Sequence, residues 1–172
     1  MKLILKILVT YFTQTGNTKK VADAIYDALP KDKDIKPLAA VKSLEDYDFT
    51  FIGFPIHQSG PANKARNFIK SKANAKKIVL FTTYASSSES PIMKDILIRC
   101  KESACDSELC GIFDCQGEMS ELIADMLMES EDPLYQQAGK MRDATIGHPT
   151  ELELENARNF TKNILRNLIE LN

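Results

Sequence analysis

Apolar runs of strand length alternate with segments of helical spacing along the chain, and this alternation constrains the fold more than any other feature. The runs cover residues 3–12, 48–55, 76–84 and 109–115, with a weaker run at residues 34–41. Continuous apolar runs are typical of strands that are buried on both faces of a parallel sheet. The alternation therefore predicts an α/β fold with a doubly wound parallel sheet and helices on both faces.

The predicted helices have recognisable starts and ends. The first begins at residue 17 or 18, and Pro30 ends it. Pro61 lies in the first turn of the next helix, where its missing N–H costs little. Near the end of the chain, Thr150 and Glu153 have the spacing of a capping box at the start of a long amphipathic helix.

The length of 172 residues fits one domain, which we expect to span residues 1–172 with a helical excursion at about 118–146. We expect no nucleic-acid partner, because no basic run is interleaved with aromatic residues. No apolar run reaches the roughly 18 residues that span a bilayer, so we expect no membrane insertion. Lys6 interrupts the apolar N-terminus and no small-residue cleavage site follows, which favours a buried strand over a signal peptide and a cytoplasmic location.

Charge and cysteine content give weaker indications. Residues 1–100 have a balance of +7 and residues 101–172 a balance of −9, so the two halves can present faces of opposite sign or merely a solvated surface. The four cysteines follow one another at five-residue spacing, at Cys100, Cys105, Cys110 and Cys115. Neither a helix nor a strand brings four residues of that spacing together, so we expect free thiols rather than a metal site.

The turn "TQTGNT" at residues 13–18 follows the first apolar run and leads into a helix. A helix N-terminus presents unpaired N–H groups and a partial positive charge, which together attract an anion. Gly16 permits a tight backbone path, and the threonine hydroxyls and the Asn17 amide add hydrogen-bond donors. The turn is therefore suited to a phosphate group, although turns rich in threonine also simply cap helices.

Other phosphate loops fit the sequence less well. The Walker A pattern GxxxxGKS/T requires a Gly-Lys pair, and the chain has none. The dinucleotide pattern GxGxxG is absent as well. Two further polar turns, "PIHQSG" and "TYASSS", follow the third and fourth predicted strands, and ligands of such folds bind at the carboxyl ends of the strands. A monophosphate compound held at this edge of the sheet is the best chemical match.

The turn "TQTGNT" after an apolar first strand resembles the phosphate-binding loop of flavodoxins, Ser/Thr-x-Thr-Gly-x-Thr, and the likeness covers essentially the whole chain. The resemblance implies a flavodoxin-like fold of three α/β/α layers, with five parallel strands in the order 2-1-3-4-5. It also implies non-covalent FMN as cofactor. The phosphate would lie on Thr13, Gln14, Thr15, Gly16, Asn17 and Thr18.

The same resemblance places the isoalloxazine ring of FMN between the turns after the third and fourth strands. The residues concerned are Pro55, Ile56, His57, Thr83, Tyr84, Ala85 and Ser86. Tyr84 is the candidate to stack on the ring, or else a partly buried aromatic at a strand end. His57 is the candidate to donate a hydrogen bond at the flavin edge, or else a solvated loop residue.

Two departures from flavodoxins bear on function. The chain has no tryptophan to stack on a flavin, and its net charge of −2 is nearly neutral, whereas flavodoxin electron carriers are usually strongly acidic.

Three hypotheses for the function remain. The first hypothesis is electron transfer through FMN to or from a redox partner protein. The second is an FMN-dependent reductase or dehydrogenase that acts on a quinone, a porphyrin-type or another small substrate with NAD(P)H. The third is a binding or regulatory module that has lost FMN. Residues 118–146 are expected to form a partner or substrate surface over the FMN edge.

Overall fold

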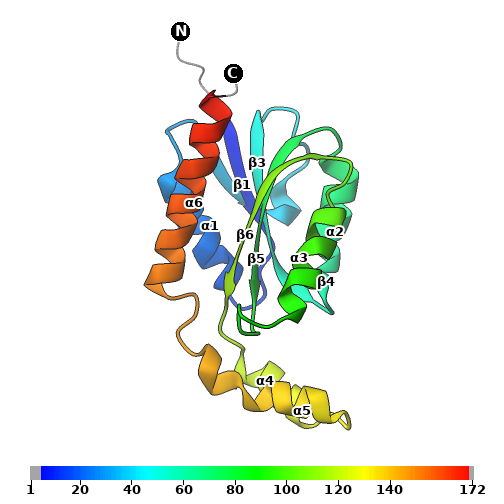
Figure 1. Ribbon diagram of the computed structural model, residues 1–172. Coiled ribbons are helices and arrows are strands. Elements are labelled where there is room, and N and C mark those ends of the chain that lie inside the picture. Colours follow the sequence, from blue (N-terminus) through cyan, green and yellow to red (C-terminus); the bar gives the residue numbers. More distant parts are fainter. Residues whose placement is uncertain (1–4, 171–172) are drawn as a thin grey trace.

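The computed structural model describes residues 5–170, so Leu3 and Ile4 of the expected first strand lie outside the described residues. Five strands form a parallel sheet: β1 (Ile7–Tyr11), β2 (Lys33–Pro37), β3 (Phe49–His57), β5 (Lys77–Tyr84) and β6 (Glu108–Gln116). Their spatial order is β2-β1-β3-β5-β6 (Figure 1). This is the expected order 2-1-3-4-5. The expected fourth and fifth strands are labelled β5 and β6, because the short β4 precedes them in the chain. The expected α/β fold with its doubly wound parallel sheet is confirmed.

Helices cover both faces of this sheet (Figure 1). On one face lie α1 (Asn17–Ala28) and α6 (Glu151–Glu170), and on the other lie α2 (Asn63–Lys72) and α3 (Ile92–Glu102). Successive side chains of a strand point to opposite faces, so Ile7 and Val9 pack with α1 and α6 while Leu8 packs with α2 and α3. Two hydrophobic layers of one core therefore enclose the sheet, as the apolar runs predict.

One edge of the sheet is formed by the short strand β2. The strand β2 ends at Pro37, which has no N–H to donate and is tolerated at an edge. After it comes a short 3-10 helix, η1 (Leu38–Ala40), where the sequence pattern suggested a longer strand. The short strand β4 (Gly60–Pro61), which pairs antiparallel with the end of β3, was not predicted from the sequence. The expectation that Pro61 lies in the first turn of a helix is wrong, because Pro61 pairs with Ile56 and α2 begins at Asn63.

Gly53 shows how closely the centre of the sheet is packed. It lies in β3, directly opposite Phe81 of β5. A Cβ atom at residue 53 would stand 2.0 Å from a ring carbon of Phe81. The ring therefore occupies the space that any larger side chain at this position would need.

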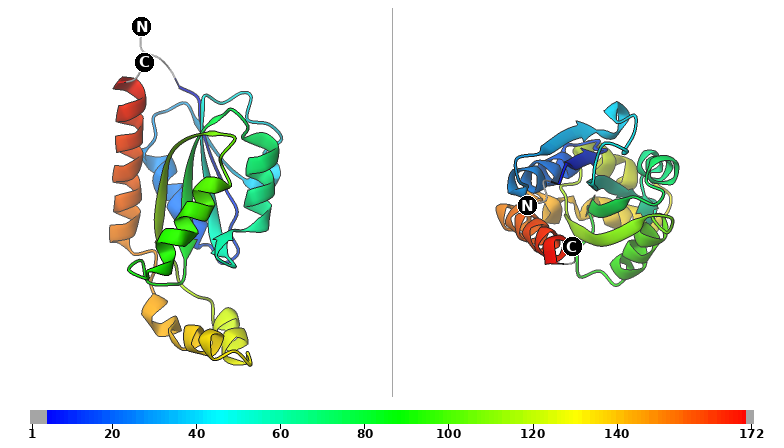
Figure 2. Two further views of the ribbon diagram at one scale, coloured as in Figure 1. Left: turned by 45° about the vertical axis from the view of Figure 1, so that its right-hand side comes forward. Right: turned by 90° about the horizontal axis from the view of Figure 1, so that it is seen from above.

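A helical hairpin extends from the carboxyl edge of the sheet, between β6 and α6 (Figures 1 and 2). It consists of α4 (Glu121–Met128) and α5 (Pro133–Lys140), and η2 (Arg142–Thr145) leads back from it. Ser120 caps α4 by accepting the N–H of Ile123, and Asp132 caps α5 by accepting the N–H of Leu134. We use the name hairpin for α4 and α5 together.

The four cysteines are free thiols. Cys100 and Cys115 are buried, Cys110 is half-buried and Cys105 is exposed. Burial raises the pKa of Cys100 to about 12, so this thiol stays protonated near neutral pH. Within residues 5–170, no helix is both long enough and apolar enough to cross a membrane.

Candidate functional site

Three loops meet at the carboxyl edge of the sheet and surround a cavity of about 990 Å³. They follow β1, β3 and β5, whose carboxyl ends lie at the same edge because the strands are parallel. Of the residues named from the sequence, eight line this cavity: Gln14, Thr15, Asn17, Ile56, His57, Tyr84, Ala85 and Ser86. Residues from three distant stretches of the chain are thus brought together at one concave site.

The other five named residues are Thr13, Gly16, Thr18, Pro55 and Thr83, and none of them is part of this cavity wall. Thr13 lines a neighbouring cavity of about 470 Å³. The hydroxyl groups of Thr18 and Thr83 lie 2.8 Å apart in a buried hydrogen bond. This bond joins the start of α1 to the end of β5, so these two threonines hold the loops in place from beneath the cavity.

The loop between β1 and α1 leaves the positive end of α1 open. Gly16, at the N-cap position, has a φ of 94°, in the left-handed region that favours glycine. Thr13 Oγ1 accepts the Gly16 N–H at 3.0 Å and so closes the loop on itself. No side chain caps α1 and its first turn contains no acidic residue, so no negative charge within this turn opposes a bound anion.

Asn17 connects this loop to the segment that leads into the hairpin. Its Nδ2 donates to Glu118 O at 2.8 Å and to Thr15 Oγ1 at 3.3 Å. Gly117 is needed for this approach, since a Cβ atom there would lie 2.7 Å from Asn17 Nδ2. The loop after β1 and the segment after β6 are therefore held together by one side chain.

The turn after β3 is a tight β-turn with two central residues, and it joins β3 to β4. His57 pairs with Gly60 across it, and the two central residues, Gln58 and Ser59, have φ values of 47° and 66°. Such values match a type I′ turn, which usually contains Asn and Gly, so this backbone is strained. Partial burial lowers the pKa of His57 below its usual 6.5, so its ring is neutral at pH 7. The ring stands edge-on to Phe12, with 6.4 Å between the ring centroids.

Tyr84, at the end of β5, is held firmly in place. Its side chain is 6% exposed and belongs to the core beside α2 and α3, although it also contributes to the cavity wall. Its hydroxyl donates to Asp114 Oδ2 at 2.5 Å. Burial, together with this carboxylate, raises the pKa of Tyr84 well above its usual value of 10. The phenol therefore remains neutral, and only a limited part of the ring can touch a ligand.

Several groups in the cavity wall were not predicted from the sequence. Phe12 contributes from the end of β1, and Lys64 and Arg66 contribute from α2. The Lys64 Nζ lies 5.1 Å from the centre of the Phe12 ring, within the range of a cation–π contact. The hairpin supplies apolar side chains as well: Ile123, Met126, Leu127, Tyr135 and Ala138. The signal in the sequence that could have indicated Lys64 and Arg66 is the basic composition of residues 64–77, next to the predicted ring-binding turn.

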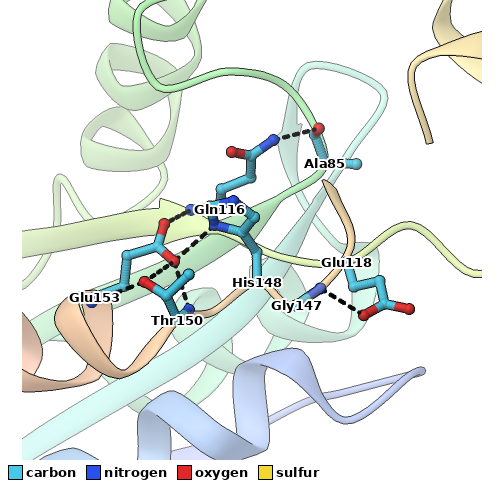
Figure 3. A network of polar contacts seen from close by, with 7 residues as sticks. All are labelled: Ala85, Gln116, Glu118, Gly147, His148, Thr150 and Glu153. Carbon is cyan, nitrogen blue, oxygen red and sulfur yellow. Dashed lines mark hydrogen bonds and ion pairs between the residues drawn. The ribbon is translucent and has the colours of Figure 1, made fainter. Parts of the chain in front are cut away.

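A network of polar contacts holds the base of the hairpin (Figure 3). We call residues 116–120 and 145–148 the neck. Glu118 Oε2 accepts the N–H of Gly147 at 3.0 Å, and the Glu118 N–H donates to the carbonyl of His148. Beside the neck, Glu153 Oε2 accepts the Thr150 N–H at 2.6 Å and lies 2.7 Å from His148 Nδ1. The expected capping box of Thr150 and Glu153 is confirmed, since the Glu153 N–H also donates to Thr150 Oγ1.

The fold and the site define a doubly wound α/β protein with a cavity where three βα loops converge. Residues 8–162 match the family described as "Flavodoxin domain". The chain belongs to this family.

Relatives and solved structures agree with this assignment. The chain is 32% identical over 171 residues to the flavodoxin-like domain-containing protein BilS of Clostridioides difficile (strain CD3), covering 94% of this chain and 97% of that protein. A flavodoxin from the domain Archaea has a TM-score of 0.57 at 18% identity, covering 96% of this chain and 99% of that one. A flavoprotein from Lactobacillus acidophilus, solved in complex with FMN, has a TM-score of 0.55 at 18% identity and covers 72% of this chain and 98% of that one. At these identities the two structures show the fold alone.

Proposed function

We propose that the protein binds FMN non-covalently and transfers electrons through it to or from a redox partner protein. The observation that carries this proposal is the meeting of the loops after β1, β3 and β5 at one cavity, beside the open positive end of α1. The similarity to a flavoprotein that was solved with FMN supports the choice of cofactor. The proposal includes a cytoplasmic location, where free thiols such as those of this chain persist.

The residues at the site fit FMN. The phosphate is assigned to the loop of residues 13–18, where hydroxyl groups, amide donors and the positive end of α1 favour a dianion. The isoalloxazine ring is assigned to the space between residues 55–57 and residues 83–86. When bound, the flavin supplies the one-electron or two-electron redox chemistry, and the protein positions it and tunes its surroundings. The neutral His57 ring can donate a hydrogen bond without adding a charge beside the flavin.

Spectroscopy and titration test the cofactor assignment. The purified protein is expected to show the yellow flavin spectrum, and protein freed of flavin is expected to bind FMN with a low-micromolar or smaller Kd. The phosphate assignment predicts that Thr15→Ala, which removes a hydroxyl from the cavity wall, weakens FMN binding about tenfold, the usual effect of a hydrogen bond to a charged group. Thr18→Ala acts only indirectly, because the Thr18 hydroxyl is bonded to that of Thr83. Riboflavin lacks the phosphate, so its affinity should not change in Thr15→Ala. Absence of FMN binding in the low micromolar range would contradict the proposal.

A second candidate function is supported by the apolar surface that the hairpin presents to the cavity. In that case the protein is an FMN-dependent reductase or dehydrogenase that uses NAD(P)H and acts on a quinone, a porphyrin-type or another small substrate. The side chains of Ile123, Met126 and Tyr135 provide a wall for such a molecule. Reduction of the bound flavin by NAD(P)H alone, at a rate that supports turnover, would favour the enzyme. Reduction that requires a partner reductase would favour the carrier.

A further inference from the structure

The cavity has a second wall that the FMN assignment leaves unused. The loops after β1, β3 and β5 account for the proposed contacts of the phosphate and the ring. Two other elements also line the cavity: the start of α2, through Lys64 and Arg66, and the hairpin, through Ile123, Met126 and Tyr135 among others. A volume of about 990 Å³ is at the upper end of the range of about 300–1,000 Å³ that small-molecule pockets occupy. The remaining wall therefore calls for a second ligand.

The charge of this second wall is positive. Among residues 5–170, neither Lys64 nor Arg66 forms an ion pair with an acidic side chain. No acidic residue occurs between Asp48 and Glu89, so the strand and helix around these cations bring no compensating charge. The acidic residue in the cavity wall is Glu118. Its carboxylate already accepts the Gly147 N–H at 3.0 Å, and its Oε1 lies 4.0 Å from Nη2 of Arg142. Two cations thus line the cavity with no acidic side chain of residues 5–170 within ion-pair distance, although Arg66 also borders a second cavity whose wall includes Glu102 and Asp106.

The opposite part of the same wall is apolar and partly open to water. Ile123 is 40% exposed, Met126 is 63% exposed and Tyr135 is 55% exposed. Methionine adapts its shape to a ligand, and an aromatic ring packs well on another flat ring. A ligand that covers these three side chains removes apolar surface from water and is stabilised by that burial.

We propose that the part of the cavity between α2 and the hairpin binds a flat conjugated molecule that carries a carboxylate or sulfonate group. The ring system packs on Ile123, Met126 and Tyr135, and the anionic group pairs with Arg66 and Lys64. The proposal rests on the proposed function only in placing this ligand next to FMN. It gives the second candidate function a substrate class, namely aromatic anions rather than neutral aromatic compounds.

Two probes with one ring system separate charge from shape. They are 9,10-anthraquinone-2-sulfonate and the neutral 2-(hydroxymethyl)-9,10-anthraquinone, titrated into the FMN-loaded protein at low salt. Binding is measured by calorimetry and by the change in the flavin absorption spectrum. We expect the sulfonate to bind about tenfold more tightly, as for a hydrogen-bonded charge pair. This advantage should shrink as salt is added, because salt screens exposed charges.

Substitutions test separately whether the anionic group binds at α2 and whether the ring system packs on the hairpin. Arg66→Gln is expected to remove most of the preference for the sulfonate. Lys70→Gln is the matched control, because Lys70 belongs to the same helix, carries the same charge and is not part of this cavity wall. On the hairpin, Met126→Ser should weaken both probes about fivefold through lost apolar burial. Leu134→Ser is its control, since Leu134 is 74% exposed and lies outside the cavity wall.

Several outcomes would overturn the proposal. These are equal affinity for the two probes, no binding of either, or equal effects of Arg66→Gln and Lys70→Gln. Weakening by Leu134→Ser as large as that by Met126→Ser would also overturn it, because the apolar contact would then not be specific to the cavity wall. FMN affinity is measured first on every variant. If FMN does not bind at all, the proposed function fails, and the two probes are then titrated into the flavin-free protein to judge the anion site separately.

Discussion

The central sheet and the hairpin are built in opposite ways from apolar side chains. In the sheet, Leu8, Phe54 and Leu80 are fully buried between two helical layers. In the hairpin, Leu122 is 70% exposed and Leu134 is 74% exposed. The sheet thus uses its apolar residues for its own packing, whereas the hairpin leaves many of them in water. Exposed apolar surface of this kind marks places where proteins bind other molecules.

The two regions also differ in what holds them. The sheet is held by parallel strand pairing and by both hydrophobic layers. The hairpin is held to the rest of the molecule by the polar contacts of the neck, and by the Asn17 side chain that donates to Glu118 O. We infer that the sheet carries the stability of the protein, while the hairpin carries little of it and is available for binding. Four predictions test this division.

The largest effect is expected from Gly53→Ala in the centre of the sheet. The added Cβ would stand 2.0 Å from a ring carbon of Phe81, a distance that requires the ring or the strand to move. Overpacking of a well-packed core costs about 1–3 kcal/mol, and the severe overlap places this variant at the upper end, about 3 kcal/mol. Urea denaturation measures the loss. The double variant Gly53→Ala with Phe81→Leu should recover part of it, because the smaller side chain makes room.

Glu153→Ala should have the next largest effect, because Glu153 joins α6 to the neck. Its carboxylate accepts the N–H groups of Thr150 and Gln116 and contacts His148. Loss of a helix cap together with a charged hydrogen-bond acceptor is expected to cost about 2 kcal/mol. The control is Glu155→Ala on the same helix, which removes an exposed contact to Arg158 and should cost at most about 0.5 kcal/mol. Equal losses for the two variants would show that the neck contributes nothing to stability.

Much of the fold could be predicted from the sequence, because its main signals are local. The apolar runs and the Thr150–Glu153 spacing each depend on a few neighbouring residues, and they correspond to strands and to the start of α6 in the structure. The expectation for Pro61 was wrong, because this residue pairs in β4 and α2 begins only at Asn63. The strand β4 was missed since two residues, Gly60 and Pro61, carry no periodic pattern. The parallel sheet then explains why the loops after β1, β3 and β5 converge.

The finer features of the site depend on contacts between distant residues, which the sequence does not reveal. The Thr18 and Thr83 hydroxyls meet across 65 residues, and Tyr84 meets Asp114 across 30. These pairings decide which threonines can line the cavity and how much of the Tyr84 ring is available. Likewise, nothing local indicates that Arg66 of α2 and Met126 of the hairpin line one cavity. Whether the named residues contact FMN stays a prediction.

Gly139→Ala tests the hairpin itself. A Cβ atom at residue 139 would stand 2.7 Å from the backbone oxygen of Ala124, so α4 and α5 must separate. We expect hydrogen exchange of the hairpin amides to become about tenfold faster, which corresponds to about 1.4 kcal/mol of local stability. The urea midpoint of the whole protein should hardly change. A fall in that midpoint as large as that of Gly53→Ala would contradict the division between sheet and hairpin.

The smallest effect concerns His57, at the cavity that the two regions share. Burial lowers its folded-state pKa, so the unfolded chain takes up this proton at a higher pH than the folded one. Stability is therefore unaffected by His57 above pH 6.5, and it decreases as the pH falls from 6.5 to the folded-state pKa. We expect NMR titration to give a pKa below 6.5 for His57, and His57→Gln to lose less stability than the native protein between pH 7 and pH 5.

The Gly139→Ala variant shows which region buries the His57 ring. If the ring is buried by the sheet side, as the Phe12 contact indicates, Gly139→Ala should leave the pKa of His57 unchanged. A rise to 6.5 in Gly139→Ala would show instead that the hairpin shields His57 from water.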